Sequence, residues 1–337
     1  MTRFTPLSDK PVVTIVVPML NEAGFIEACL EGFSAQTWPA ELLDVVVVDG
    51  GSTDGSRTTV ESWAASHPWV GVIDNANRCA AAAFNRGIEV ARGEVLCLFS
   101  SHGVPAEDYV ERSVEVLHDS GAVGVGGAYL HVGLDPRSSA IGLAMVSPFG
   151  MASPHRSATH RIEVDTISHP AYVLEALRDA GPFDESMLRN EDYEMNWRLR
   201  ERGGSLVVDP LISSIYRPRG TIRALGRQFF WYGRFKARML RDHPRSVQPR
   251  HLVPPAAVLG AVAAPWLLGS RRTRPIVLVG FVGYLAVLAA ALRRAHPRDH
   301  DASPAAFVAA LPVMHASWGV GLFAGVIEMI RDRASRR

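Results

Sequence analysis

The architecture of this chain is first indicated by the segment Val12-Val13-Thr14-Ile15-Val16-Val17-Pro18-Met19-Leu20-Asn21-Glu22. Its first six residues are apolar and mostly β-branched, which is typical of a buried parallel strand. Pro18 is expected to end this strand. Asn21 can then cap a helix, since apolar residues follow it at helical spacing. The segment therefore predicts a strand followed directly by a helix.

The same alternation continues through the first 130 residues. Strands are predicted over 44–49, 69–74 and 94–99, and helices lie between them, the second reaching about Ser66 and the third covering 79–91. Strands that alternate with helices indicate right-handed crossovers and a mostly parallel α/β sheet with helices on both faces. Ligands of such sheets bind at the carboxyl ends of the strands, where Pro18, Asp49 and Ser100 lie.

Residues 134–165 show weaker periodicity and are rich in Gly, Ser, Pro and His. We expect a long mobile loop here, near the ligand site and able to become ordered when ligand binds. The histidines in and near this segment lack the spacing of a metal-binding pair, so solvated loop histidines are the preferred interpretation.

Charge is balanced in total but uneven along the chain. Lys and Arg number 35 against 34 Asp and Glu, whereas bases outnumber acids from Arg217 to Arg250 and in the last seven residues. These basic runs flank apolar segments, which favours an anionic lipid surface as the partner. No nucleic-acid partner is expected.

Three segments, 252–268, 276–292 and 305–327, contain no Asp, Glu, Lys or Arg. At about 1.5 Å per residue the second and third can cross, or nearly cross, a bilayer core of about 30 Å. Every short connection is basic, so three simple crossings would conflict with the positive-inside rule. Multi-pass and hairpin anchoring both stay open, and the proline-rich first segment is a candidate for the membrane interface.

A second informative run is Arg189-Asn190-Glu191-Asp192-Tyr193-Glu194-Met195-Asn196-Trp197-Arg198-Leu199-Arg200. It places adjacent carboxylates at the start of a predicted helix that Gly203-Gly204 ends. A carboxylate held at a helix start can remove a proton from a hydroxyl group. Taken alone, an adjacent Glu-Asp pair fits a solvated acidic first turn of a helix better than a catalytic site.

Several motifs together resemble the family-2 glycosyltransferases, which have a GT-A domain. They are Pro18-Met19-Leu20-Asn21-Glu22, Val48-Asp49-Gly50-Gly51-Ser52-Thr53-Asp54-Gly55, Asn85-Arg86-Gly87-Ile88 with Ala91-Arg92-Gly93-Glu94, and Asn190-Glu191-Asp192. The resemblance covers residues 12 to about 210. It implies a GT-A nucleotide-sugar-binding domain over 1–220. The residues that follow predict an amphipathic interfacial segment over 221–250 and a membrane domain over 251–330 with up to three hydrophobic helices.

Two further stretches narrow the resemblance. Tyr216-Arg217-Pro218-Arg219-Gly220, followed by Arg227-Gln228-Phe229-Phe230-Trp231-Tyr232-Gly233, and later His315-Ala316-Ser317-Trp318-Gly319-Val320-Gly321 are similar to membrane-bound glucosyltransferases of succinoglycan-type exopolysaccharide assembly. The similarity implies inverting transfer of one sugar from a nucleotide-sugar, with UDP-sugars favoured, to a lipid-linked saccharide. The enzyme would sit in the inner (plasma) membrane with its catalytic domain in the cytoplasm.

The resemblance also implies roles for individual residues. Asp192 is the expected catalytic base and Glu191 assists it or contacts the acceptor. Gln228 and Trp231 replace part of the Gln-x-x-Arg-Trp motif of processive relatives, so polymerisation through a channel is not expected. The donor-binding candidates are Pro18, Asn21, Glu22, Asp49, Arg78, Ser100 and His102, and the acceptor-binding candidates are Asn190, Gln228 and Trp231.

The fourth strand departs from the family pattern. The family places Asp-x-Asp or Asp-Ala-His there to bind Mn²⁺ or Mg²⁺, whereas this chain reads Ser100-Ser101-His102. A hard cation prefers charged oxygen ligands, so a neutral Ser100 weakens a metal site. Three outcomes follow: the cation is held by donor phosphates, His102 and waters; His102 donates a hydrogen bond to the diphosphate without metal; or activity is lost.

Two other functions remain in view. One is a polyprenyl-phosphate sugar synthase, whose acceptor is already ionised and needs no base. The other is a non-catalytic glycosyltransferase-like protein that binds a partner enzyme at the membrane. Ser100 favours the second, and the intact Asn190-Glu191-Asp192 disfavours it.

Overall fold

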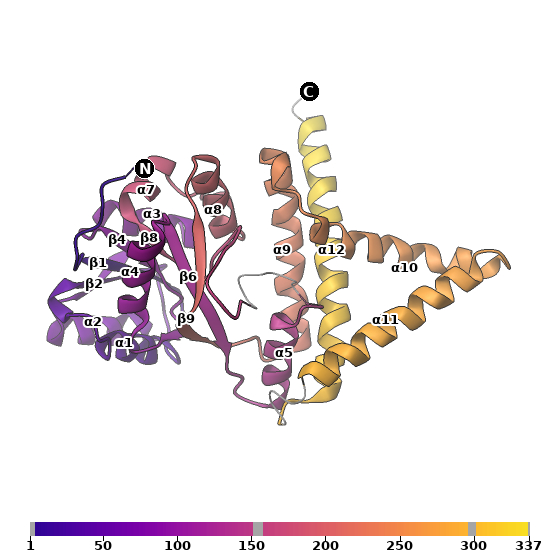
Figure 1. The fold of residues 1–337 in the computed structure, drawn as a ribbon, viewed down its shortest axis with the longest axis horizontal. Coiled ribbons are helices and arrows are strands. Elements are labelled where there is room, and N and C mark those ends of the chain that lie inside the picture. Colours follow the sequence, from indigo (N-terminus) through magenta and orange to yellow (C-terminus); the bar gives the residue numbers. More distant parts are fainter. Residues whose placement is uncertain (1–3, 151–157, 296–300, 336–337) are drawn as a thin grey trace. The chain divides into compact units, whose positions relative to one another are not determined.

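The computed structural model describes residues 4–150, 158–295 and 301–335, and it divides into two compact units (Figure 1). The first unit contains Met1–Leu130 and Pro154–Tyr216, and the second contains His131–Ser153 and Arg217–Arg337. The short segment 131–153 thus groups with the C-terminal residues, although it lies inside the span expected for the GT-A domain.

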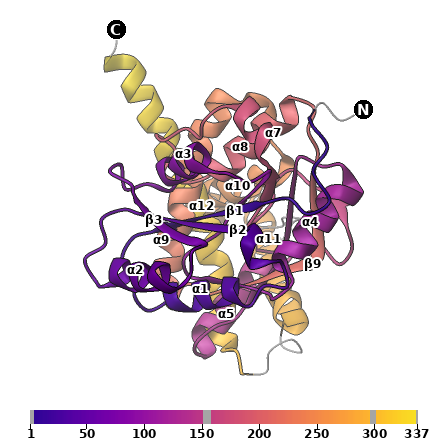
Figure 2. The same cartoon turned by 90° about the vertical axis from the view of Figure 1, so that its left-hand side faces the viewer.

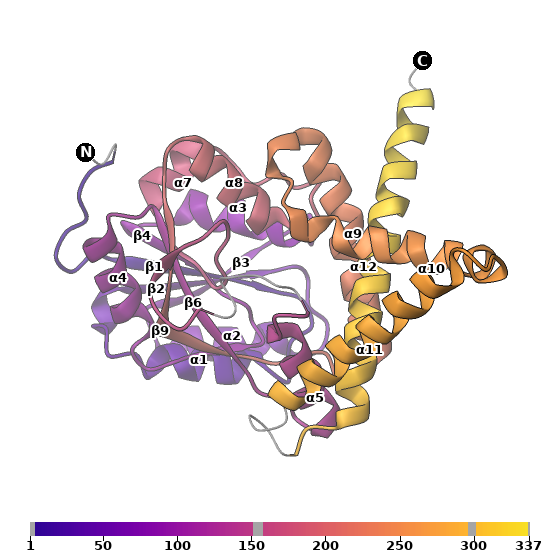
Figure 3. The same ribbon diagram turned by 45° about the vertical axis from the view of Figure 1, so that its right-hand side comes forward.

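The first unit is built on a sheet of nine described strands in the order β3-β2-β1-β4-β8-β6-β9-β5, with β7 paired to β9. The strands are β1 (Val13–Met19), β2 (Leu43–Asp49), β3 (Val70–Asp74), β4 (Val95–Leu98), β5 (Gly103–Pro105), β6 (Gly124–His131), β7 (Ile162–Glu163), β8 (Ala171–Val173) and β9 (Leu206–Tyr216). The helices are α1 (Ile26–Ser34), α2 (Ser56–Ser66), α3 (Ala80–Val90), α4 (Tyr109–Ser120), α7 (Leu174–Ala180) and α8 (Glu191–Glu201). Figures 2 and 3 show α1 and α2 on one face of the sheet and α3, α7 and α8 on the other.

The four predicted strands and the helices between them are present, and β1 pairs in parallel with both β2 and β4. Beyond β4 the sheet is antiparallel, because β8 pairs with β4 and with β6 in the opposite direction. The sheet is therefore mixed rather than mostly parallel. The alternation of strand and helix patterns in the sequence predicts only the first four strands. These are the strands that helical crossovers connect to parallel partners.

Two local predictions at the end of β1 are wrong. The strand continues through Pro18 to Met19, since its ladder with β4 ends at the pair Val16–Leu98 and the missing amide hydrogen of Pro18 removes no bond from it. Asn21 is not a helix cap, because α1 begins only at Ile26. Instead Asn21 has a left-handed backbone (φ 57°) and its side-chain oxygen accepts a hydrogen bond from the Thr53 amide at 2.8 Å.

The predicted loop 134–165 is also partly wrong. It contains a helix, α5 (Pro136–Val146), whose start is fixed by a capping box in which Asp135 accepts from the amides of Arg137 and Ser138. Residues 151–157 of that predicted loop lie outside the described residues. The cap lowers the helix energy by satisfying amides that have no partner within the helix.

The glycine motif Asn85-Arg86-Gly87 has a packing explanation. A Cβ atom on Gly87 would lie 2.3 Å from a methyl carbon of Val16, so α3 can approach β1 only with glycine there. A Cβ atom on Gly93 would lie 2.3 Å from the carbonyl oxygen of Val12. Because both positions lack a side chain, the neighbouring backbone packs closely against β1. This packing holds the strand ends at which the candidate site lies.

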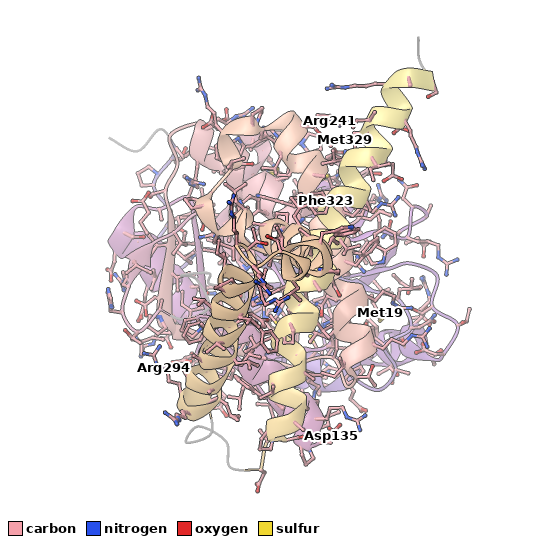
Figure 4. The ribbon with its side chains drawn as sticks, turned by 90° about the vertical axis from the view of Figure 1, so that its right-hand side faces the viewer. Met19, Asp135, Arg241, Arg294, Phe323 and Met329 are labelled. Carbon is pink, nitrogen blue, oxygen red and sulfur yellow. The ribbon has the colours of Figure 1, made fainter. Side chains whose placement is uncertain are left out.

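The second unit is helical. It comprises α5, α9 (Ile222–Asp242), α10 (Val253–Gly269), α11 (Arg274–Ala295) and α12 (Pro304–Ser335), with short 3-10 turns over Pro244–Ser246 and Pro249–His251. Helices α9 and α12 pack side by side in very close contact, as Figure 1 shows. A Cβ atom on Gly233 of α9 would lie 2.0 Å from the Trp318 carbonyl oxygen, and one on Gly321 of α12 would lie 2.0 Å from that of Phe230. Figure 4 marks Phe323 and Met329 along α12.

Three helical spans, Pro249–Gly269, Arg274–Ala295 and Pro304–Ser335, are long and apolar enough to cross a membrane. They coincide with the three predicted apolar segments. Side chains of α10 and α11 stay largely exposed within the unit, with Trp266 at 74% and Val279 at 72%. In α12, His315 contacts the Phe149 carbonyl oxygen at 2.8 Å and the Tyr284 hydroxyl at 3.2 Å, which supports a packing role for this histidine within the helical unit.

Candidate functional site

The carboxyl end of β2 presents a buried carboxylate. Asp49 is 1% exposed, and it accepts hydrogen bonds from the Ser52 amide at 3.1 Å and the Ser52 hydroxyl at 2.6 Å. Arg57 lies 3.3 Å from Asp49 and 2.7 Å from Asp74 at the end of β3. Arg57 was not predicted from the sequence, because the bridge depends on β2 and β3 being neighbours in space. These contacts hold the Asp49 carboxylate in a fixed position, where its oxygens can accept hydrogen bonds from a nucleoside.

The turn after β1 is tied to the turn after β2. The amides of Asn21 and Glu22 donate to the hydroxyls of Ser52 and Ser56 at 2.9 Å and 2.7 Å. Pro18 is paired with Val48 in the register of β1 and β2, and it lies three residues before Asn21, where these contacts begin. The predicted donor residues Pro18, Asn21, Glu22 and Asp49 are therefore brought together at one edge of the sheet.

The end of β4 brings His102 against the same edge. Its Nδ1 atom lies 3.5 Å from a carboxylate oxygen of Glu22, and its ring packs edge-on against Phe25 and Tyr216, with centroids 6.5 Å and 6.0 Å away. Ser100 is half-buried at the strand end. Tyr216 was not predicted as a site residue; only its place in the Tyr216–Gly220 motif marked it.

A cation site formed by protein side chains alone does not fit these residues. Glu22 and His102 supply one carboxylate and one imidazole, and the position of the family's first carboxylate is the hydroxyl of Ser100. Within the described ranges no group of three His, Cys, Asp or Glu side chains is arranged to hold a metal ion. Mn²⁺ or Mg²⁺ would need most of its oxygen ligands from elsewhere.

Arg78 lies between β3 and α3 with an exposed side chain and a left-handed backbone (φ 55°). Its amide donates to the Asn75 carbonyl oxygen at 3.2 Å, which shapes the turn into the helix. An exposed guanidinium next to a helix start can bind phosphate oxygens, since both carry positive charge.

The adjacent carboxylates begin α8, as predicted, and Gly203 follows its end with φ 86°. Asn190 precedes the helix in a left-handed conformation (φ 64°), and its carbonyl oxygen accepts the Glu194 amide at 3.0 Å. Asp192 is exposed, whereas Glu191 is half-buried. An incoming hydroxyl can therefore reach Asp192 more easily than Glu191.

Burial and the neighbouring charge of Asp192 together raise the pKa of Glu191 to about 7. The unfolded chain has an ordinary glutamate pKa, so the folded state holds the proton more tightly between about pH 4.5 and 7. Stability contributed by protonated Glu191 is present at low pH and is lost as pH rises through this window.

Glu191→Gln is therefore expected to stabilise the protein at pH 8, where the wild-type carboxylate is ionised and half-buried. The gain should be on the order of 1–2 kcal/mol after allowance for solvent screening. At pH 4.5 the two proteins should melt alike. Thermal unfolding in detergent at both pH values checks this, and equal stabilities at pH 8 would contradict the raised pKa.

The segment that leads into α8 is held by side-chain amides of α3 and of the turn before α3. Asn85 of α3 accepts from the Phe183 amide at 2.7 Å and donates to the Phe183 carbonyl oxygen at 3.0 Å. Asn77 donates to Glu185 at 2.6 Å. From α8 itself, Arg198 donates to the carbonyl oxygens of Ala180 and Pro182 at 2.7 Å and 2.8 Å. These bonds fix the position of the carboxylates at the start of α8.

Gln228 and Trp231 belong to α9 in the second unit. Gln228 donates to the Tyr232 hydroxyl at 2.9 Å. The guanidinium of Arg234 lies 4.7 Å from the centre of the Trp231 ring, which stacks on Phe235 at 6.0 Å. Their acceptor-binding role stays a prediction.

Comparison with known proteins identifies the chain. The family model "Glycosyl transferase family 2" matches residues 14–171. The succinoglycan biosynthesis protein ExoA of Rhizobium meliloti (strain 1021) is 33% identical over 320 residues, which cover 94% of this chain and 96% of that protein. The chain belongs to the family-2 glycosyltransferases. This glycosyltransferase is also 25% identical, over 68% of its length and 74% of the relative, to a dolichyl N-acetyl-α-D-glucosaminyl phosphate 3-β-D-2,3-diacetamido-2,3-dideoxy-β-D-glucuronosyltransferase of Methanococcus voltae.

The fold of this family-2 glycosyltransferase has a solved counterpart. The mannosyltransferase PcManGT from Pyrobaculum calidifontis, determined with GDP-mannose and Mn²⁺, is 22% identical, covers 97% of this chain and 90% of its own, and superposes with a TM-score of 0.65. The similarity confirms the predicted GT-A fold followed by apolar helices. The exopolysaccharide-type resemblance drawn from the motifs is confirmed as well, and the predicted apolar helices are long and apolar enough to span a membrane.

Proposed function

We propose that this glycosyltransferase moves a single sugar from a nucleotide-sugar to a lipid-linked saccharide, with inversion at the anomeric carbon. The setting is exopolysaccharide or cell-envelope glycan synthesis at the cytoplasmic face of the plasma membrane. The observation that carries the proposal is the similarity to a succinoglycan biosynthesis protein over nearly its whole length, the apolar helices included. The name of the archaeal relative, which specifies a dolichyl-phosphate-linked sugar as acceptor, is consistent with it.

Several described residues have the chemistry that the proposed reaction needs. The acceptor hydroxyl gives its proton to Asp192 while its oxygen bonds to the anomeric carbon, and the bond from that carbon to the diphosphate breaks on the opposite side. Asp192 is exposed at the start of α8, where such a hydroxyl can reach it. Negative charge develops on the leaving diphosphate, and Arg78 and His102 are the cationic and hydrogen-bonding groups assigned to it.

UDP-sugars are the favoured donors in this proposal. The Asp49 carboxylate is held where it can accept hydrogen bonds from a nucleoside. Gly50 occupies the position of a second acidic residue in many relatives, so the identity of the nucleobase has to be tested. A screen of the purified full-length protein against UDP- and GDP-sugars is the direct test. Calorimetry should show binding of one class at micromolar to millimolar Kd. Absence of binding to every nucleotide-sugar at millimolar concentration would refute the proposed function.

The altered strand end predicts an unusual metal dependence. Mn²⁺ titrated into nucleotide-free protein should bind weakly, because Ser100 carries no charge, and affinity should rise steeply when UDP is present. Ser100→Asp should strengthen Mn²⁺ binding, and His102→Ala should weaken donor binding. Ser62→Asp, which adds the same charge at an exposed position of α2, is the matched control. Tight Mn²⁺ binding without nucleotide, unchanged in His102→Ala, would place the cation elsewhere.

A further inference from the structure

The three apolar spans of the second unit differ in how much protein covers them. In the most apolar part of each span, 6% of the residues of Pro249–Gly269 and 11% of those of Arg274–Ala295 are buried, against 39% for Pro304–Ser335. Figures 1 and 3 show that α10 and α11 extend away from α12 and meet at their connection, whereas α9 lies along α12. Helices α10 and α11 therefore keep large apolar surfaces that the unit does not cover, and α12 keeps much less.

Helix α12 is packed against three other elements of the unit. A Cβ atom on Gly226 of α9 would lie 3.1 Å from the Val313 side chain, and one on Gly325 would lie 2.4 Å from the backbone of α9. A Cβ atom on Gly319 would lie 2.7 Å from the Pro254 carbonyl oxygen of α10. Helix α5 contacts α12 as well. Lipid can therefore reach only part of the α12 surface.

The helix that lies along α12 is too polar for the hydrocarbon of a bilayer. Helix α9 carries five arginines, one lysine and one aspartate among its 21 residues. Each Lys or Arg at the centre of a membrane helix costs about 2.5–3.5 kcal/mol, so α9 does not enter the hydrocarbon. Its Arg234 is also paired with Glu328 of α12, at 2.8 Å. The part of α12 from Val313 to Glu328, which packs along α9, is thereby kept out of the hydrocarbon too.

What remains of α12 is too short to cross a membrane. The residues before this contact, Pro304–Pro312, extend for roughly 13 Å, less than half of a bilayer core of about 30 Å. The residues after it include Arg331, Asp332 and Arg333. The apolar composition of α12 is therefore explained by its packing against α5, α9 and α10 within the unit.

The ends of α10 and α11 have the charges expected of two crossings. The spans Pro249–Gly269 and Arg274–Ala295 have 21 and 22 residues, or about 31 to 33 Å each, which matches the bilayer core. Arg271 and Arg272 lie in the connection between them, and Arg293 and Arg294 lie at the end of α11. Arginines at both ends can reach lipid phosphates on the two sides of a membrane.

We propose that α10 and α11 alone cross the bilayer, as a two-helix hairpin, and that α12 stays beside α9 at the cytoplasmic surface. The exposed apolar faces of α10 and α11 would then be covered by lipid acyl chains. Two crossings return the chain to the side from which it entered, so the basic C-terminal residues Arg331–Arg337 would lie in the cytoplasm, as the positive-inside rule favours. Three crossings would place them outside. The inference goes beyond the proposed function and does not depend on the donor or the acceptor.

Cysteine labelling of the full-length protein in spheroplasts of a bacterial host tests this topology. The background is Cys79→Ser, because Cys29 and Cys97 are buried and only Cys79 is partly accessible. In this background Ser270→Cys, at the end of α10, should react with a membrane-impermeant maleimide in intact spheroplasts. Ser335→Cys, at the end of α12, should react only after the membrane is permeabilised. Both serines are exposed, and Cys79→Ser alone, which should stay unlabelled, is the control.

Two labelling results would overturn the proposal. Reaction of Ser335→Cys in intact spheroplasts would show that α12 crosses the membrane. Failure of Ser270→Cys to react there would show that the hairpin does not reach the other side.

A charge-insertion experiment gives an independent readout. Val320→Lys/Ile327→Lys places two charges at exposed positions of α12, and Trp266→Lys/Val279→Lys places two on α10 and α11. After a high-salt wash the α12 variant should remain in the membrane fraction as the wild type does, whereas the α10–α11 variant should be largely lost from it. Equal losses from both variants would contradict the proposal. Absence of nucleotide-sugar binding would count against the proposed function instead, since it has no bearing on the number of crossings.

Discussion

Asp192→Asn is expected to lower the rate of sugar transfer by about 10²–10⁴-fold while nucleotide-sugar binding is retained. The amide keeps the size of the side chain but cannot accept the proton of the acceptor hydroxyl. Asp192 is exposed at the first turn of α8, and the segment before that helix is anchored by Asn85 and Arg198. The substitution should therefore leave the helix in place. Single-turnover transfer and donor calorimetry on the same preparation separate chemistry from binding.

Glu201→Gln is the matched control for this variant, because it removes one exposed carboxylate from the other end of α8. It should transfer sugar at close to the wild-type rate. Near-normal turnover by Asp192→Asn would show that another group removes the proton, and Glu191, with its pKa of about 7, would then be the first residue to test.

The full-length protein is expected to remain in the membrane fraction after a high-salt wash. Salt screens surface charge but does not weaken burial of the apolar α10 and α11. Retention should fall sharply in Trp266→Lys/Val279→Lys, because each charge placed in the hydrocarbon layer costs about 2.5–3.5 kcal/mol. Both side chains are largely exposed within the unit, so the substitution leaves its packing intact.

The control for membrane retention is Val247→Lys, which adds a charge at an exposed position outside the three apolar spans. It should stay with the membrane as the wild type does. Fractionation and immunoblotting after the wash give the measurement. Full-length wild-type protein recovered in the supernatant without detergent would refute the membrane assignment.

The first four strands could be predicted because a strand that is buried on both faces of a sheet appears in the sequence as a nearly continuous apolar run. Residues 12–17 and 44–49 are nearly continuous β-branched runs, and they became β1 and β2. The antiparallel half could not be predicted in this way. Strands β5, β7 and β8 have only two or three residues each, too few for a periodic pattern. The longer strands β6 and β9 contain Gly126-Gly127 and Asp209-Pro210, residues that are typical of turns rather than strands.

The two residues misjudged or missed at the site, Asn21 and Arg57, share one physical cause. Asn21 has the residue type of a helix cap, but its side chain bonds to Thr53 on another turn, and only the tertiary fold provides that partner. Arg57 connects Asp49 and Asp74 for the same reason. Helix α5 was a different failure, because Asp135-Pro136 followed by Ser138 is a local start signal that a Gly- and Ser-rich composition obscured.

The glycine contacts between α9 and α12 limit how this enzyme can be recombined with its relatives. Gly233 and Gly321 each allow one backbone to touch the other, and Gly325 would place a Cβ atom 2.4 Å from the Arg234 carbonyl oxygen. A hybrid that takes α9 from one relative and α12 from another must keep all three positions small. The two helices are distant in sequence, so we expect crossover points between them to give inactive hybrids, and the pair to be inherited as one exchangeable module.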